Sequence, residues 1–142
     1  MKLTRLSYNA FKTWFAGKES EYELVGSCHG LYRYNSPGEN HYLRCTDEHR
    51  QTVGISFITK EKNDTLYIEL FEVAKSKRGL GYGRQMFDEL IRVYQPKRVE
   101  LTFPDDSKDA KRFWNHIGFH KLKRDGELYA NELYMNIRKK IR

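Results

Sequence analysis

Apolar and polar positions alternate along this chain with two periods, one typical of strands and one typical of helices. Ser7 is placed to cap a short helix that ends near Gly17. Phe11, Trp14 and Phe15 share one face of that helix. Three extended segments follow, separated by polar turns, and we expect them to form an antiparallel meander. These segments are HYLRCTD (41–47), QTVGISFITK (51–60) and TLYIELFEVA (65–74).

The second half of the chain continues with a helix, a strand, a second helix and a hairpin. The first helix presents an apolar face until Pro96 ends it, and RVELTFP (98–104) follows as a strand. The second helix stops at Gly118, and residues 119–124 and 128–137 then flank the turn RDGE as a final hairpin. The apolar faces consist of Met86, Phe87, Leu90, Ile91 and Tyr94 in the first helix, and of Ala110, Phe113, Trp114 and Ile117 in the second.

The order of these elements predicts the fold class. A strand, a helix and a strand in succession need a crossover connection, and therefore a parallel pair of strands. We predict an α/β fold with a mixed, mostly antiparallel central sheet and helices on both faces. A chain of 142 residues is the usual size of one compact domain, so we expect a single domain over residues 1–142.

Charge and composition narrow the compartment and the partners. The longest apolar runs are far shorter than the roughly 20 residues that span a bilayer, and Lys12 interrupts the N-terminal segment, so we expect a cytoplasmic protein without a membrane partner. Cys28 and Cys45 lie outside any Cys/His cluster, which predicts neither a metal site nor a disulfide framework. A net charge of +7 favours anionic partners, namely nucleic acid, a phosphorylated cofactor or an acidic protein.

The segment TLYIELFEVA has an irregular apolar pattern. Leu66, Ile68 and Leu70 alternate on one face, and Phe71 and Val73 then continue out of phase. A β-bulge near residues 70–71 would produce this change. A strand that is buried on both faces would produce it without a bulge.

The stretch VAKSKRGLGYGRQMFDEL (73–90) places three glycines at alternate positions before a helix, among basic residues. Such a turn exposes backbone N–H groups at the positive end of a helix, so we expect a ligand that carries phosphate. A Walker loop is excluded because Gly83 is followed by Arg84 and Gln85. The dinucleotide fingerprint GxGxxG also fails, which leaves the spacing Arg78-x-x-Gly81-x-Gly83.

Together with DAKRFWNHIGF (109–119), this stretch resembles the GNAT superfamily of N-acetyltransferases. Arg78, Gly81 and Gly83 match the pyrophosphate motif of that family. A second family pattern is matched at Ala110, Gly118 and Phe119, whereas Trp114 stands where the family has a tyrosine. The match is good over residues 65–120, while the first 40 residues match only in length.

The resemblance implies an acetyltransferase that moves an acetyl group from acetyl-coenzyme A to a primary amine, by direct transfer in a ternary complex. In the family, the strand before the glycine loop splays from its neighbour, and the gap receives the pantetheine arm of the cofactor. Backbone groups of that strand then hold the pantetheine, and loop amides hold the pyrophosphate. The implied cofactor-binding residues are Phe71, Val73, Ala74, Arg78, Gly79, Leu80, Gly81, Tyr82, Gly83, Arg84, Ser107 and Trp114.

Two of these residues have structural alternatives. Ser107 stands where the family often has an asparagine that contacts the cofactor, and it is also placed to cap the following helix. Trp114 shares the apolar stripe of that helix, so packing is a better interpretation than stacking on the cofactor.

Glu69 and Glu72 are the candidate catalytic residues. An amine must lose a proton before it attacks, and a carboxylate on the strand that faces the thioester could accept it directly or through water. In the family, a glutamate base, where one exists, sits at the position of Tyr67. Glu69 is two residues away and shares a face with Tyr67 and Phe71 if the strand is regular, so we favour it over Glu72. Both carboxylates could instead be solvated or paired with lysine.

The departing thiolate lacks the family's usual acid, because the indole N–H of Trp114 is not a usable acid. Three explanations stay open: solvent protonates the thiolate, His116 replaces the tyrosine, or the protein binds the cofactor without turnover. We favour protonation by solvent, because the thiolate of a thiol with a pKa of about 8.5 needs no dedicated acid.

The acceptor and two rival functions stay open. The resemblance places the acceptor cleft at residues 8–30 and 122–130, where Glu19, Glu21 and Glu23 form either an acidic wall or a solvated charge run. The sequence is compatible with three acceptors: a small-molecule amine, a peptide N-terminus and a protein lysine. It is also compatible with a homodimer. One rival is a non-catalytic acyl-coenzyme A-binding module, suggested by Trp114. The other, less favoured, is a nucleic-acid binder, suggested by the net charge and by the tail Arg138, Lys139, Lys140 and Arg142.

Overall fold

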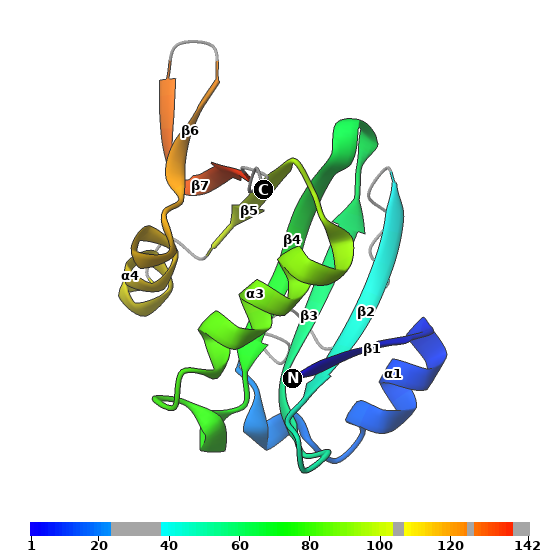
Figure 1. Cartoon of the computed structure of the whole chain (residues 1–142). Helices are drawn as coiled ribbons and strands as arrows, with labels where there is room; N and C mark the ends of the chain where they lie inside the picture. Colours follow the sequence, from blue (N-terminus) through cyan, green and yellow to red (C-terminus); the bar gives the residue numbers. More distant parts are fainter. Residues whose placement is uncertain (24–37, 104–106, 125–126, 138–142) are drawn as a thin grey trace.

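A computed structural model describes residues 1–23, 38–103, 107–124 and 127–137. Within these residues, seven strands form one sheet in the order β1-β2-β3-β4-β5-β7-β6 (Figure 1). The strands are β1 (Lys2–Leu6), β2 (Glu39–Thr46), β3 (Thr52–Lys60), β4 (Thr65–Val73), β5 (Arg98–Thr102), β6 (His120–Arg124) and β7 (Glu127–Asn136). The α-helices are α1 (Tyr8–Phe15), α3 (Tyr82–Tyr94) and α4 (Lys108–Ile117), and the short 3-10 turns are η1 (Glu19–Glu21), η2 (Lys62–Asp64) and η3 (Lys75–Lys77).

The sheet is mixed and mostly antiparallel, as predicted. β4 and β5 run parallel, and α3 makes the crossover between them. The other neighbouring pairs, from β1–β2 to β6–β7, run antiparallel. The predicted meander and final hairpin are confirmed, although the two residues at the tip of the hairpin lie outside the described part of the chain.

The N-terminal strand β1 was not predicted. It pairs antiparallel with β2 at the edge of the sheet, from Lys2 opposite Thr46 to Leu6 opposite Tyr42. Its sequence KLTRL offers only five residues of alternation before the helix begins, which is too short to separate a strand from an extended entry to a helix.

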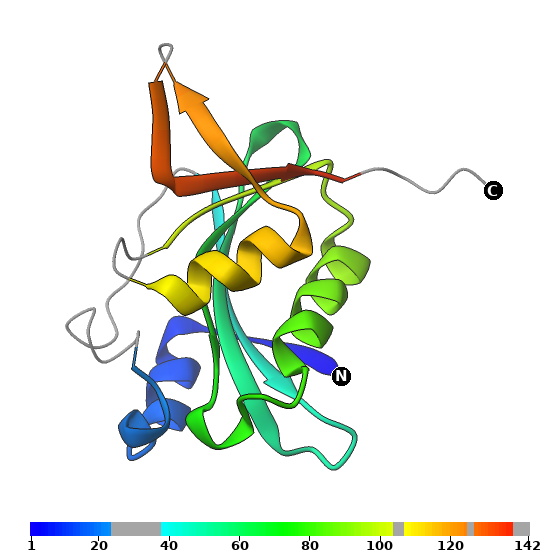
Figure 2. The same ribbon diagram turned by 90° about the vertical axis from the view of Figure 1, so that its left-hand side faces the viewer.

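Helices cover both faces of the sheet, with α1 on one side and α3 on the other (Figure 2). On the α1 face, Phe11 and Phe15 pack in a buried cluster with residues of β2, β3 and β4. On the opposite face, the larger cluster joins residues of α3 and α4 to the strands, including Phe87, Trp114 and Ile68. None of the helices in the described residues is long and apolar enough to cross a membrane.

The helices begin and end at the predicted signals. The Ser7 hydroxyl caps α1 by accepting a hydrogen bond from the Ala10 N–H at 3.1 Å. Helix α3 ends at Gln95, which adopts the left-handed conformation immediately before Pro96. Gly118 ends α4 with φ of 118°, a conformation that glycine adopts without strain.

Strand β4 contains the predicted bulge, but one residue earlier than expected. Leu70 pairs with Phe57 and Ile68 with Ile58, so Glu69 is the extra residue. Ile68 therefore packs in the cluster on the α3 and α4 face, and Leu70 packs in the cluster on the α1 face. Leu70 misled the prediction because both faces of this sheet are buried, and an apolar side chain does not then reveal its face.

Candidate functional site

Strands β4 and β5 separate halfway along β4. Their parallel pairing starts at Thr65 opposite Arg98 and stops at Ile68 opposite Leu101. From Leu70 to Val73, β4 continues to pair with β3 alone, and the end of β5 pairs with β7. In the described part of the chain, no strand lies beside this second half of β4 on its β5 side. The structure therefore has the splayed strands that the family resemblance led us to expect.

The backbone of β4 offers polar groups to this gap. The Ala74 N–H donates to the Val53 carbonyl of β3 at 2.9 Å. Backbone groups of an antiparallel strand alternate in direction, so those of Glu72 also face β3, whereas those of Phe71 and Val73 face the gap. Both backbone groups of Ala74 are bonded within the protein, because its carbonyl also accepts a bond from the Lys77 N–H at 2.8 Å.

The glycine loop after β4 is open around its backbone. Gly79 and Gly81 have φ of 77° and 84°, and a Cβ on either residue would meet no other atom within 4 Å. Gly81 is also the N-cap residue of α3, and the cap lacks a side-chain hydrogen bond. The first turn of α3 contains no acidic residue. Its N–H groups therefore form a site suited to an anion, at the end of the gap.

The third glycine of the loop has a packing role. A Cβ on Gly83 would lie 3.0 Å from the Phe113 ring, so glycine allows α3 to approach α4 closely here. Leu80 lies between the two open glycines with 63% of its surface exposed. The Arg84 guanidinium points along α3 and lies 3.3 Å from the Asp88 carboxylate.

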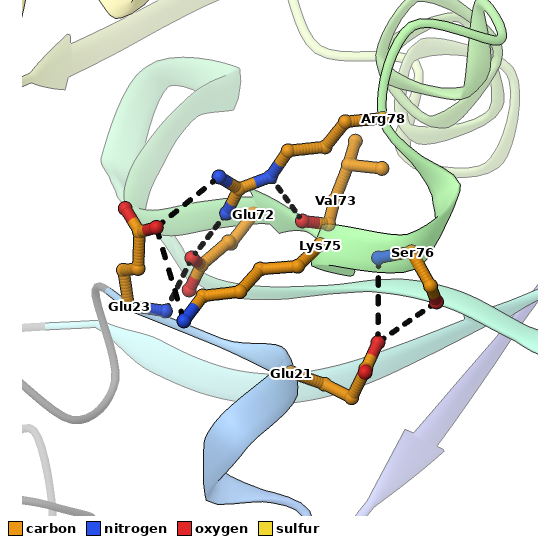
Figure 3. A network of polar contacts seen from close by, with 7 residues as sticks. All are labelled: Glu21, Glu23, Glu72, Val73, Lys75, Ser76 and Arg78. Carbon is orange, nitrogen blue, oxygen red and sulfur yellow. Dashed lines mark hydrogen bonds and ion pairs between the residues drawn. The ribbon is translucent and has the colours of Figure 1, made fainter.

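A buried carboxylate connects the loop to the end of β4 (Figure 3). Glu72 is only 4% exposed, and its Oε2 accepts hydrogen bonds from Arg78 Nη2 at 2.9 Å and from the Glu23 N–H at 2.7 Å. Arg78 Nε also donates to the Val73 carbonyl at 3.2 Å. The side chain of Arg78 is thus fixed by protein groups on β4.

The acidic residues of the N-terminal segment contact the same loop (Figure 3). Glu21 accepts hydrogen bonds from Ser76, at 2.8 Å from its Oγ and at 3.4 Å from its N–H. The Glu23 carboxylate lies 3.5 Å from Arg78 Nη1 and 3.9 Å from Lys75 Nζ. Both residues therefore link the N-terminal segment to the loop, while the Glu23 side chain stays 61% exposed. The acidic wall and the solvated charge run both stay predictions.

Glu69 lies on the α1 face of the sheet beside the point where β4 and β5 separate. Its Oε1 is 3.2 Å from the hydroxyl of Thr59, the residue that pairs with Tyr67 across β3 and β4. The Tyr67 hydroxyl bonds Thr102 at 2.7 Å. Burial raises the pKa of Tyr67, and the nearby charges of Glu69 and Glu132 raise it further, against the effect of the Thr102 hydrogen bond.

The bulge corrects one expectation about Glu69. A regular strand would place Glu69 on one face with both Tyr67 and Phe71. Instead Phe71 packs against Phe113 and Trp114 of α4, on the opposite face. Glu69 therefore shares its face with Tyr67 only.

Comparisons with known proteins agree with this geometry. The sequence model for the acetyltransferase (GNAT) domain matches residues 12–133. The chain belongs to the GNAT acetyltransferase family. Members of this family are acyltransferases. A search of curated protein sequences gives no significant match.

Solved structures of GNAT acetyltransferases share the fold at low sequence identity. A GNAT-family acetyltransferase from Staphylococcus aureus Mu50 is 15% identical, with a TM-score of 0.63 over 96% of this chain and 99% of the other. A mutant of the spermidine N-acetyltransferase SpeG from Vibrio cholerae is 10% identical, with a TM-score of 0.67 over 95% of this chain and 92% of that one. An IAA acetyltransferase from Bacillus cereus ATCC 14579 is 13% identical, with a TM-score of 0.61 over 96% and 99%.

The position of the family's tyrosine is buried in this GNAT protein. Trp114 is 5% exposed, and its ring lies 5.0 Å from Phe71, 4.8 Å from Phe113 and 5.1 Å from Phe119, between centroids. These contacts give the indole a packing role. His116, the alternative acid, is exposed on α4. The Ser107 hydroxyl caps that helix by accepting from the Ala110 N–H at 3.2 Å.

Sequence reasoning missed several contacts of the site, and some of the residues that it singled out lie outside the described part of the chain. The Glu23 N–H bonds Glu72 of β4 across 49 positions, and Glu21 accepts from Ser76 of the loop across 55, and nothing in the local pattern indicates such pairs. Acceptor-cleft residues 24–30 and 125–126, Cys28, and the basic tail 138–142 lie outside the described residues. Cys45 is a buried free thiol, and within the described ranges no group of three His, Cys, Asp or Glu side chains could hold a metal ion.

Proposed function

We propose that this GNAT protein transfers an acetyl group from acetyl-coenzyme A directly to a primary amine, in a ternary complex. One observation carries the proposal: the gap between β4 and β5 leads to an open glycine loop at the N-terminus of α3. A strand edge with polar backbone groups that leads to an anion site matches a ligand with an amide-containing arm and a pyrophosphate.

The residues present fit acetyl-coenzyme A. The backbone groups of Phe71 and Val73 would hold the pantetheine arm along the edge of β4. The N–H groups of residues 79–84 would hold the pyrophosphate, because Gly79 and Gly81 leave its approach open. The bound cofactor would supply the acetyl thioester. An aimed backbone N–H that stabilises the charge developing on an acyl oxygen contributes about 10²- to 10³-fold in rate.

Glu69 is the proposed base. Deprotonating an ammonium of pKa near 10.4 at neutral pH costs about 4 to 5 kcal/mol, so a carboxylate that accepts the proton, directly or through water, lowers the barrier. Glu69 is half-buried near the separation of β4 and β5, and the charges of Glu69 and Glu132 both act on Tyr67. Two carboxylates in this place also favour a cationic acceptor over a neutral one.

The departing thiolate takes its proton from solvent in this proposal. Trp114 cannot donate it, and the tryptophan is held in the core. A thiol with a pKa of about 8.5 leaves as the thiolate at little cost near neutral pH. A small-molecule amine, a peptide N-terminus and a protein lysine remain the candidate acceptors.

A second candidate is a non-catalytic acyl-coenzyme A-binding module, favoured by Trp114 at the tyrosine position. The two functions differ in turnover. Release of free thiol from acetyl-coenzyme A should be followed with a panel of butylamine, spermidine, free lysine and a short peptide. We expect amine-dependent release with at least one of them. Cofactor binding without release across the whole panel would favour the module.

A further inference from the structure

The buried carboxylate of Glu72 does not have the surroundings of a base. It lies at the end of β4 on the α1 face, behind Tyr22, whose pKa is raised to about 12 by burial and then by the charge of Glu72. Its Oε2 accepts two hydrogen bonds, from Arg78 and from the Glu23 N–H. A buried carboxylate held in this way exchanges protons poorly with a ligand in the gap.

Arg78 connects Glu72 to the backbone at the edge of the gap. One guanidinium contacts three groups: Nη2 donates to Glu72, Nε donates to the Val73 carbonyl, and Nη1 lies 3.5 Å from Glu23. A planar guanidinium can make these contacts together, whereas a lysine ammonium has no such fixed fork. Because the Val73 carbonyl faces the gap, Arg78 sets the orientation of a group that the proposed cofactor would contact.

The same contacts fix the loop and the N-terminal segment. Arg78 directly precedes the open glycines, so its anchorage to Glu72 holds the start of the loop against β4. The Glu23 N–H bond brings the N-terminal segment to the same carboxylate, and the Glu21–Ser76 contact adds a second link nearby. The N-terminal segment, the end of β4 and the start of the glycine loop therefore meet at Glu72.

We propose that Glu72 and Arg78 are positioning residues of the cofactor site, and that Glu72 takes no proton from the acceptor. Glu72 fixes Arg78, which fixes the Val73 carbonyl and the start of the glycine loop. The affinity for coenzyme A then depends on this buried pair. The inference rests on the proposed function, and it assigns to Glu72 a role different from that of Glu69.

The test compares Glu72→Gln and Arg78→Lys with the wild type by calorimetric titration with coenzyme A, which measures binding without chemistry. We expect Kd to rise about tenfold or more in each variant, because a small displacement of aligned groups is costly. In the double variant, the fold-losses of affinity caused by Glu72→Gln and Arg78→Lys should combine to less than their product, because the two residues act as a pair. Glu19→Gln is the control, since Glu19 is an exposed acidic residue of the same N-terminal segment and should leave Kd unchanged.

The pH profile separates positioning from proton transfer. With the most reactive amine of the panel, Glu72→Gln should keep the wild-type shape of kcat against pH. An unchanged Kd in both Glu72→Gln and Arg78→Lys would overturn the inference, even if melting temperatures fell, because that result would indicate a purely structural pair. A loss of kcat at neutral pH that recovers at high pH would also overturn it.

The outcomes of this test distinguish a failure of the positioning role from a failure of the proposed function. If Glu72→Gln does not fold, as judged by circular dichroism, Arg78→Lys decides the question alone. If the wild type does not bind coenzyme A, the proposed function fails first. If the wild type binds and the variants bind equally well, only the positioning role fails.

Discussion

The two carboxylates of β4 lie on one strand but have different surroundings. Glu69 is the extra residue of the bulge and stays half-buried beside Tyr67, near the point where the strands separate. Glu72 lies three residues on and is buried against Arg78. The two residues are chemically identical, so our proposal that Glu69 is the base rests on their different surroundings.

Glu69→Gln tests that assignment at the level of chemistry. We expect kcat/KM to fall by about 10²- to 10⁴-fold at neutral pH, and by less at high pH where more of the amine is already neutral. The affinity for coenzyme A should stay close to that of the wild type. The measurement is the pH profile of amine-dependent thiol release. An equal loss at every pH would indicate that Glu69 supports the structure and is not the base.

Residue-scale chemistry was partly predictable from the sequence. The packing role of Trp114 followed from the apolar stripe of its helix. The preference for Glu69 over Glu72 stays a prediction, and the face that Glu69 was expected to share with Phe71 is wrong because of the bulge. The partners of Glu72 were not predictable, because Glu23 contacts it across 49 positions. Local patterns carry no information about such pairs, which depend on how the N-terminal segment returns to the sheet.

At the scale of elements, the loop between β4 and α3 combines two properties. Its glycines allow the left-handed backbone at Gly79 and Gly81, and its position places the N–H groups of α3 at the end of the gap. The glycine spacing predicted a turn that exposes backbone N–H groups at the start of a helix. The strand splay was expected only from the resemblance, and the structure supplies it directly through the pairing of β4 and β5.

Gly81→Val tests the role of the loop. Valine disfavours φ of 84°, and its side chain would occupy the space from which a pyrophosphate would approach, so we expect coenzyme A binding to be lost. Gly17→Val is a matched control, because Gly17 has φ of 83° and equally open surroundings at the end of α1. Both variants should lose about 1 to 2 kcal/mol of folding free energy. Normal binding by Gly81→Val in a calorimetric titration would place the anion elsewhere.

The contact between β2 and α3 predicts a pH dependence of stability. His41 is buried between Tyr94, at 2.7 Å from its Nδ1, and Glu39, at 2.9 Å from its Nε2. Burial lowers the pKa of His41, and the positive charges of Arg5 and Lys60 lower it further, against the effect of Glu39. The unfolded state therefore binds the extra proton more readily than the folded state.

The free energy of unfolding should accordingly fall as the pH drops below about 6.5, the ordinary pKa of histidine, and should gain nothing from His41 above it. Urea unfolding between pH 7.5 and 5 measures this effect. His41→Gln should flatten the dependence, whereas His116→Gln, which changes an exposed histidine, should preserve it. A slope that is unchanged in His41→Gln would show that other groups carry it.

At the scale of the whole molecule, the fold separates the groups that would bind the cofactor from the groups that would deprotonate the amine. Helices α3 and α4 cover one face of the sheet and bring the glycine loop to the gap, while Glu69 and Tyr67 lie on the α1 face. A thioester in the gap would therefore be reached by an amine from the α1 side. The sequence predicted this layered α/β arrangement but omitted β1, whose five residues were too few to reveal an edge strand.

The central claim is that acetyl-coenzyme A binds along the edge of β4 and at the glycine loop. Its most direct test is thermal and chemical unfolding of the wild type with and without acetyl-coenzyme A. A ligand specific for the folded state at a hundredfold excess over Kd should add about 2.7 kcal/mol to the free energy of unfolding. We predict such a gain for the wild type and its loss in Gly81→Val. Stability that does not change at millimolar acetyl-coenzyme A would contradict the account.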